Sequence, residues 1–163
     1  MASGLQFAVL LCLCGLWIGA DVSTMHCGCN AGCPRGWNGF AQKCYAFHRR
    51  ERNWAAAERF CNHLGGNLAS LHTIDEYNFI RGVILRQIGY HKSTWVGGHD
   101  AVREGVWLWS DGSLFDFTGW GYREPNNYKG REDCMEINFA GRDYVNDNRC
   151  YRRKSFVCVK SHC

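Results

Sequence analysis

The chain has 163 residues, with 19 Lys and Arg against 15 Asp and Glu and a formal net charge of +4. This length fits one domain around a single core. Its basic residues are spread along the chain, which argues against a nucleic-acid partner. The basic clusters at 49–52 and 152–154 are interpreted as solvated faces.

The first twenty residues carry no charged side chain and contain the apolar run FAVLLCLCGLWIG, followed by a small residue. This pattern is typical of a secretory signal peptide, which we predict over 1–20. The run is shorter than the roughly twenty apolar residues of a membrane span. The sequence therefore predicts a secreted, extracellular protein that does not insert into membranes.

Eleven cysteines are present, of which Cys12 and Cys14 fall in the predicted signal peptide. In an oxidising compartment the other nine are expected to form disulfides. Because nine is odd, at least one thiol must stay free or pair with another chain. The cluster HCGCNAGC at 26–33 has the ligand types of a zinc site, but secretion favours disulfides over thiolate metal sites.

Two helices are predicted in the first half of the chain. Asn53 can cap a helix through WAAAERFCNHL at 54–64, whose apolar positions fall on one face before the glycine pair at 65–66. Thr73 and Glu76 stand in the spacing of a capping box at the start of a second helix. Its apolar face would contain Tyr77, Ile80 and Ile84.

After about residue 93, short aromatic and β-branched runs alternate with clusters of Gly, Asp and Asn, a texture that predicts strands. The expected strands are TWVG, VWLW, CMEI and SFVCV. Between the second and third lies a polar stretch, 110–133, without a regular period. A loop of this length in a compact domain is usually functional.

Oxygen-bearing side chains gather in and just after this stretch. They are Glu124, Asn126, Glu132, Asp133, Asn146 and Asp147. Calcium takes about six to eight oxygen ligands, which carboxylates and amide carbonyls supply. A cis peptide bond before Pro125 would turn its neighbouring side chains toward one point. The pattern therefore indicates a calcium site.

Three ordered tripeptides, EPN at 124–126, EDC at 132–134 and VND at 145–147, resemble motifs of the C-type lectin carbohydrate-recognition domain. CPRGWNGFAQKCYAF resembles the family's N-terminal hairpin, TWVGG its WIGG core segment, and VWLWSDG the strand and turn before its calcium loop. The resemblance implies an α+β fold with two helices packed on small antiparallel sheets, a long calcium-binding loop and disulfide staples. The domain would span 33–163, after a cysteine-containing segment at 21–32.

By position, the resemblance implies a principal calcium site that also binds the sugar. Its ligands would be Glu124, Asn126, Glu132, Asn146 and Asp147. A possible auxiliary calcium site would use Asp100, Glu104, Asn127 and Asp133. The main departure from the family is Val145, where Trp is usual, at a position expected to pack rather than coordinate.

In such a site two neighbouring sugar hydroxyls coordinate calcium. The two glutamates accept hydrogen bonds from these hydroxyls, and the two asparagines donate N–H hydrogen bonds to the hydroxyl oxygens. The order EPN resembles that of mannose-type binders, so we expect a calcium-dependent lectin for mannose-like glycans of microbial or host glycoproteins. Tyr128 leaves galactose or lactose open, because an aromatic ring can stack on the apolar face of galactose. Likeness to fish mucus and plasma lectins suggests agglutination or opsonisation of microbes in innate defence.

The resemblance also implies three disulfides, Cys33–Cys44, Cys61–Cys158 and Cys134–Cys150. Cys27, Cys29 and Cys163 are left over, and three cysteines cannot all pair within one chain. We expect a disulfide-linked homodimer, because joining two weak sugar sites raises avidity.

Three alternatives stay open. Some fish antifreeze proteins resemble this family, but they carry extra bridges in the long-loop region, whereas this chain has no cysteine between Cys61 and Cys134. Paired carboxylates could serve a hydrolase, yet no nucleophile signature occurs and the histidines at 48, 63, 72, 91 and 99 are scattered, so we expect no enzyme. The third alternative is a calcium-stabilised domain that binds protein instead of sugar.

Overall fold

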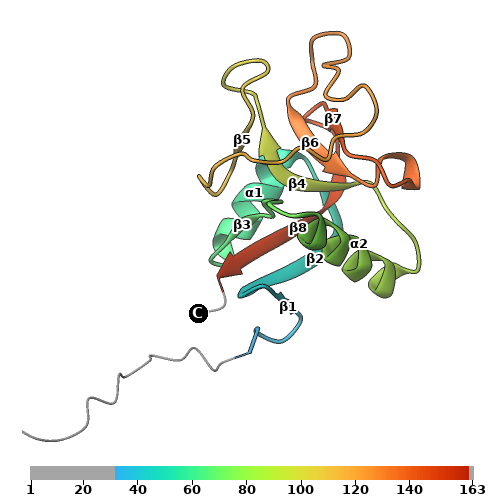
Figure 1. Ribbon diagram of the computed structural model, residues 1–163. Helices are drawn as coiled ribbons and strands as arrows, with labels where there is room; N and C mark the ends of the chain where they lie inside the picture. The colour runs from blue at the N-terminus through green and yellow to red at the C-terminus, as the bar shows by residue number, and fades with distance from the viewer. Residues whose placement is uncertain (1–31, 162–163) are drawn as a thin grey trace, which may run out of the picture.

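The computed structural model describes residues 32–161 (Figure 1). The elements in this range are β1 Asn38–Phe40, β2 Lys43–Arg52, α1 Trp54–His63, β3 Asn67–Leu68, α2 Ile74–Ile88, β4 Thr94–His99, β5 Leu108–Trp109, β6 Cys134–Ile137, the 3-10 helix η1 Phe139–Gly141, β7 Asn146–Asn148 and β8 Lys154–Ser161. The predicted signal peptide and the leftover cysteines Cys27, Cys29 and Cys163 lie outside the described residues. Within them, no helix is long and apolar enough to cross a membrane.

The strands join in one sheet with the order β1-β2-β8-β4-β6-β7, to which β3 and β5 add at β8 and β4. Every pairing is antiparallel except that of β4 with β8. The predicted α+β arrangement of two helices on an antiparallel sheet is confirmed, although the parallel pairing joins the small sheets into one. In Figure 1 the hairpin of β1 and β2 lies at one end of the molecule and the loop of residues 110–133 lies at the other.

Both predicted helices form. The Asn53 side chain accepts the Ala56 N–H at 2.8 Å, and α1 ends just before Gly65, which has a left-handed backbone (φ 78°). The Thr73 hydroxyl accepts the Glu76 N–H at 3.1 Å and caps α2. These caps satisfy N–H groups that have no partner within the helix.

Only one of the two hydrogen bonds of the predicted capping box forms at α2. The Glu76 carboxylate accepts the backbone N–H of His72 at 2.8 Å instead of that of Thr73. It also binds Lys43 Nζ at 2.9 Å and the Tyr45 hydroxyl at 3.2 Å. These two partners on β2 draw the carboxylate toward the sheet, so Glu76 ties the helix to the hairpin.

The predicted strand VWLW is shorter than expected, because only Leu108 and Trp109 pair with β4. Val106 instead donates its N–H to Arg103 O at 3.0 Å and belongs to the preceding turn. The other three predicted strand segments form β4, β6 and β8.

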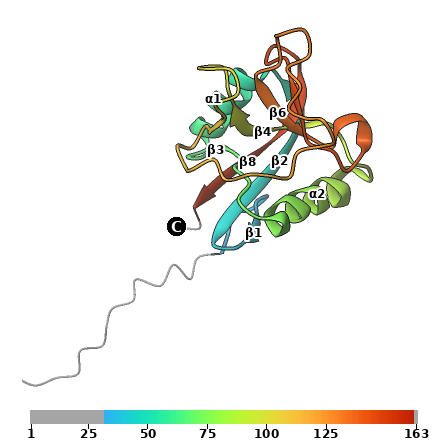
Figure 2. The ribbon, with the colours of Figure 1, turned by 45° about the horizontal axis from the view of Figure 1, so that its top comes forward.

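The two helices pack on separate parts of the sheet (Figures 1 and 2), and two apolar clusters fill the spaces. The larger cluster contains Tyr77, Ile80, Ile84 and Met135, and the smaller contains Ala57, Leu68, Trp95 and Phe156. Three disulfides, with the pairings that the resemblance implies, brace the described residues. They are Cys33–Cys44, Cys61–Cys158 and Cys134–Cys150.

A buried ion pair crosses the sheet near the long loop. Glu136 of β6 is fully buried, and its Oε2 lies 2.9 Å from Lys154 Nζ at the start of β8. The Glu136 Oε1 atom accepts the side-chain amides of Asn146 at 3.1 Å and Asn148 at 2.6 Å. One carboxylate therefore joins β6, β7 and β8.

Replacing Lys154 by Met should lower the free energy of unfolding by about 3–5 kcal/mol, because it leaves the Glu136 charge buried and unpaired. A suitable control is Lys92→Met, which breaks an equally short pair with Glu51 in which the side chains are 28% and 44% exposed. That loss should stay below about 1 kcal/mol. Urea denaturation with the disulfides intact measures both, and equal losses would contradict the assignment.

Candidate functional site

The loop of residues 110–133 contains no helix or strand, yet aromatic side chains anchor it to the larger core. Phe115 packs on Trp109 with ring centroids 4.7 Å apart, and Trp120 packs on Trp107 at 4.6 Å. Such pairs add to the free energy gained from apolar burial. The loop is therefore held at its base and is not a free excursion.

The peptide bond between Glu124 and Pro125 is cis, as the sequence suggested. Around it, Glu124 donates its N–H to Gly121 O, and Gly121 donates to Val145 O, each at 2.9 Å. Val145 is buried in the core, as expected for a position that packs. These contacts attach the predicted EPN segment to the residue that precedes β7.

Asp147 holds the other end of this segment. Its Oδ1 accepts the Asn126 N–H at 3.1 Å and its Oδ2 accepts the Asn127 N–H at 2.7 Å. Glu132 completes the turn, because its Oε2 accepts the Tyr128 N–H at 3.2 Å. Predicted ligands that are about twenty residues apart in the chain thus meet through direct hydrogen bonds.

The two glutamates of this cluster have raised pKa values. Burial raises the pKa of Glu124 to about 7, and a hydrogen bond and charge repulsion from Asp147 contribute to the same rise. Burial also raises the pKa of Glu132. The Glu124 Oε2 atom is shielded from solvent and has no hydrogen-bond partner among residues 32–161. A cation would supply the missing partner and remove the repulsion, so the residues fit a bound calcium ion.

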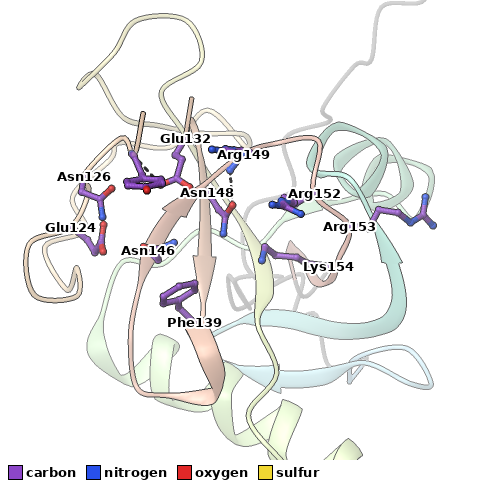
Figure 3. A pocket seen from close by; sticks show the side chains of 11 residues that line it. Glu124, Asn126, Glu132, Phe139, Asn146, Asn148, Arg149, Arg152, Arg153 and Lys154 are labelled. Carbon is purple, nitrogen blue, oxygen red and sulfur yellow. Dashed lines mark hydrogen bonds between the residues drawn. The ribbon is translucent and has the colours of Figure 1, made fainter. Parts of the chain in front are cut away.

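A cavity of about 680 Å³ opens beside these groups (Figure 3). Four of the five predicted principal ligands line it, namely Glu124, Asn126, Glu132 and Asn146. Asp147 contacts the first two of them. Tyr128 also lines the cavity and is 58% exposed.

The four residues of the predicted auxiliary site form a second acidic cluster. Oxygen atoms of Asp100, Glu104 and Asp133 lie within 4.8 Å of one another, and the Asn127 amide donates to Glu104. Burial raises the pKa of Asp100, and the negative charges of Asp133 and Asp147 raise it further. Asp100 Oδ1 is buried without a hydrogen-bond partner among the described residues. This donor set also fits a calcium ion.

A family model described as "Lectin C-type domain" matches residues 50–160, which is more than half of the chain. The chain belongs to the C-type lectin domain family. This family and its fold are non-enzymatic and carbohydrate-binding.

Curated lectins match most of the chain or nearly all of it. The galactose-specific lectin nattectin of Thalassophryne nattereri is 43% identical over 99% of both chains. The lactose-binding lectin l-2 of Anguilla japonica is 38% identical over 80% of both chains. Among solved structures, a Ca²⁺-dependent type II antifreeze protein in its Ca²⁺-free form is 31% identical and covers 79% of this chain and 100% of its own, with a TM-score of 0.73.

Several residues around the lectin cavity were missed by the sequence interpretation. Glu136 supports the site from below, because it holds Asn146 and Asn148 on β7. A charged residue between apolar neighbours in a buried strand was the available signal. Arg149 also lines the cavity, as does the basic cluster 152–154, which we had interpreted only as a solvated face.

One histidine, His72, meets two polar residues of the long loop. Its Nδ1 lies 2.8 Å from Asp116 Oδ1, and its Nε2 lies 3.3 Å from the Ser113 hydroxyl. These distances resemble those of a serine hydrolase triad. The Ser113 hydroxyl, however, donates its proton to Asp111 Oδ1 at 2.6 Å. His72 therefore does not take that proton, and the cluster braces the lectin loop.

Proposed function

We propose that this protein is a secreted, calcium-dependent lectin that binds glycans at the cavity beside β7. One observation carries the proposal: carboxylate and amide side chains from the loop and from β7 line one cavity, and one of them, Glu124, has a buried oxygen without a partner within the described part of the chain. Membership of the C-type lectin family supports the same function.

In this proposal the side chains that hold the cation also hold the sugar. Calcium would accept two vicinal sugar hydroxyls as ligands. Glu124 and Glu132 would accept hydrogen bonds from the hydroxyls, and Asn126 would donate an N–H hydrogen bond to a hydroxyl oxygen. The Asn146 amide now donates to Glu136 and to the backbone carbonyl of Asp147, so it would have to turn before it could serve the sugar. Glu136 would keep Lys154 and Asn148 as partners.

Calcium binding should depend on Asp147. The Asp147→Ala change removes one ligand and the acceptor that holds Asn126 and Asn127. We expect the intact protein to bind calcium with a Kd on the order of 10⁻⁴ to 10⁻³ M, as extracellular modules do, and the variant to bind at least about tenfold more weakly. Calorimetric titration and the calcium-induced rise in Tm measure this. Asp75→Ala, at an exposed aspartate of α2, is the matched control, and an unchanged titration in Asp147→Ala would refute the assignment.

The order of Glu124 and Asn126 supports a preference for mannose-type sugars, whose 3- and 4-hydroxyls are both equatorial. Galactose is a second candidate for two reasons. The relatives nattectin and l-2 are described as galactose-specific and lactose-binding, and the half-exposed ring of Tyr128 at the cavity could stack on galactose.

The double exchange Glu124→Gln with Asn126→Asp should shift the preference from mannose-like toward galactose-like sugars. The exchange swaps the acceptor and donor sides around the ion and leaves the net charge unchanged. Competitive elution of the variant and the intact protein from mannose and galactose columns measures the change. If galactose alone elutes the intact protein from a mannose column, the mannose-type assignment fails and the galactose candidate replaces it.

Ice binding is a weaker candidate. The similarity to a type II antifreeze protein supports it, whereas the carboxylates gathered at the cavity favour a cation and a sugar. Thermal hysteresis of the purified protein would distinguish this function from lectin activity.

A covalent dimer is part of the proposed function. Cys27, Cys29 and Cys163 are outside the three disulfides of the described residues, and at least one of them would link two chains. Two linked sites could raise avidity by up to about 10²- to 10⁴-fold, which would suit agglutination of microbes. Non-reducing electrophoresis should show a band at twice the monomer mass that collapses on reduction. A monomer under both conditions would refute the link.

A further inference from the structure

The cavity beside the proposed sugar site has two walls of opposite charge. Glu124 and Asn126 lie on one side, and Arg152, Arg153 and Lys154 lie on the other (Figure 3). Arg149 lies beside Glu132 at the edge between them. The basic side chains come from the turn after β7 and from the start of β8, and none of them belongs to the calcium-binding motifs.

Two of the four cations already have strong partners. Lys154 pairs with Glu136 and lies over the ring of Trp95 at 5.1 Å. Arg153 donates from Nη2 to Glu51 O at 2.7 Å. Lys154 and Arg153 would therefore have to give up these contacts before they could turn toward a ligand.

Arg149 and Arg152 are different. Within residues 32–161, neither forms an ion pair with a carboxylate. Arg149 makes one hydrogen bond, from Nη1 to the Tyr151 hydroxyl at 3.2 Å, and its Nε has no acceptor in the described part of the chain. Arg152 is exposed and only approaches the Tyr151 ring, at 5.8 Å. Both guanidinium groups keep N–H donors that no protein group uses.

The charge balance of the cavity favours an anion once calcium is bound. Three carboxylates of the principal site and one divalent cation leave a single negative charge. The guanidinium groups at 149, 152 and 153 add three positive charges, so the cavity as a whole is positive. A neutral sugar would leave this potential unused.

We propose that the glycan bound at this site carries an anionic substituent, which Arg149 and Arg152 hold against the wall opposite Glu124. This inference rests on the proposed lectin function and names its ligand class. A guanidinium group offers paired N–H donors that match sulfate, phosphate or carboxylate oxygens in a fork. When the 3- and 4-hydroxyls of a sugar bind calcium, the substituent at carbon 6 is the one nearest the bound 4-hydroxyl, and we assign the anionic group to this position.

The test uses the full chain at saturating calcium with three forms of mannose, N-acetylglucosamine and galactose. These are the neutral sugar, its 6-O-sulfate or 6-phosphate, and its uronic acid, so that ester and carboxylate sources are separated. We expect at least one anionic form to bind about tenfold more tightly than the neutral sugar at 0.15 M salt. The ratio should fall toward one at about 1 M salt, where the Debye length shortens to about 3 Å.

In the double variant Arg149→Gln with Arg152→Gln, the ratio of anionic to neutral binding should fall to within about twofold. The matched control Arg35→Gln with Arg59→Gln removes the same charge from exposed positions outside the cavity and should keep the ratio. Equal binding of neutral and anionic forms by the intact protein would overturn the inference while leaving the lectin function in place. An equal fall in the control would also overturn it, because net charge and not this wall would then be responsible. Failure to bind any of the sugars would overturn the proposed function itself.

Discussion

The candidate site depends on one buried carboxylate. Glu136 is fully buried, and Lys154 pairs with it across the sheet. Its second oxygen holds Asn146 and Asn148, the first and last residues of β7. A strand of three residues has few backbone hydrogen bonds of its own, so these side-chain bonds fix where Asp147 points. Breaking a buried ion pair of this kind lowers the free energy of unfolding strongly. The pair therefore favours this one arrangement of β6, β7 and β8.

The loop above this support is organised by two different forces. Aromatic packing of Phe115 and Trp120 against the core fixes its base. Its rim has the opposite character, because burial and then repulsion from Asp147 raise the pKa of Glu124 to about 7. A rigid base lets the protein keep mutually repelling carboxylates close together without local rearrangement. The donor types of this group fit a bound cation.

Local patterns predicted the elements, while contacts distant in the chain decided the site. Asn53 and Thr73 predicted the starts of the two helices, because a capping side chain binds N–H groups within the first turn of its helix. The return contact of Glu76 was predicted wrongly, since Lys43 and Tyr45 come from another element. The oxygen-bearing side chains of the EPN, EDC and VND motifs indicated a calcium site, and the resemblance to a family assigned the ligands of its principal ion. Neither local pattern nor motif could show that Glu136 lies beneath them or that Arg152 faces them across a cavity.

The two walls of the cavity also link the cation to the sugar. Without a cation, three carboxylates on one side offset the three guanidinium groups at 149, 152 and 153, and an anionic glycan gains little. A divalent ion would shift this balance by two positive charges within the same cavity. Coupling between two bound ligands is reciprocal. An anionic glycan would therefore strengthen calcium binding by the same factor by which calcium strengthens binding of the glycan. A weak calcium site would then be filled most completely when the protein is bound to a surface that carries the glycan.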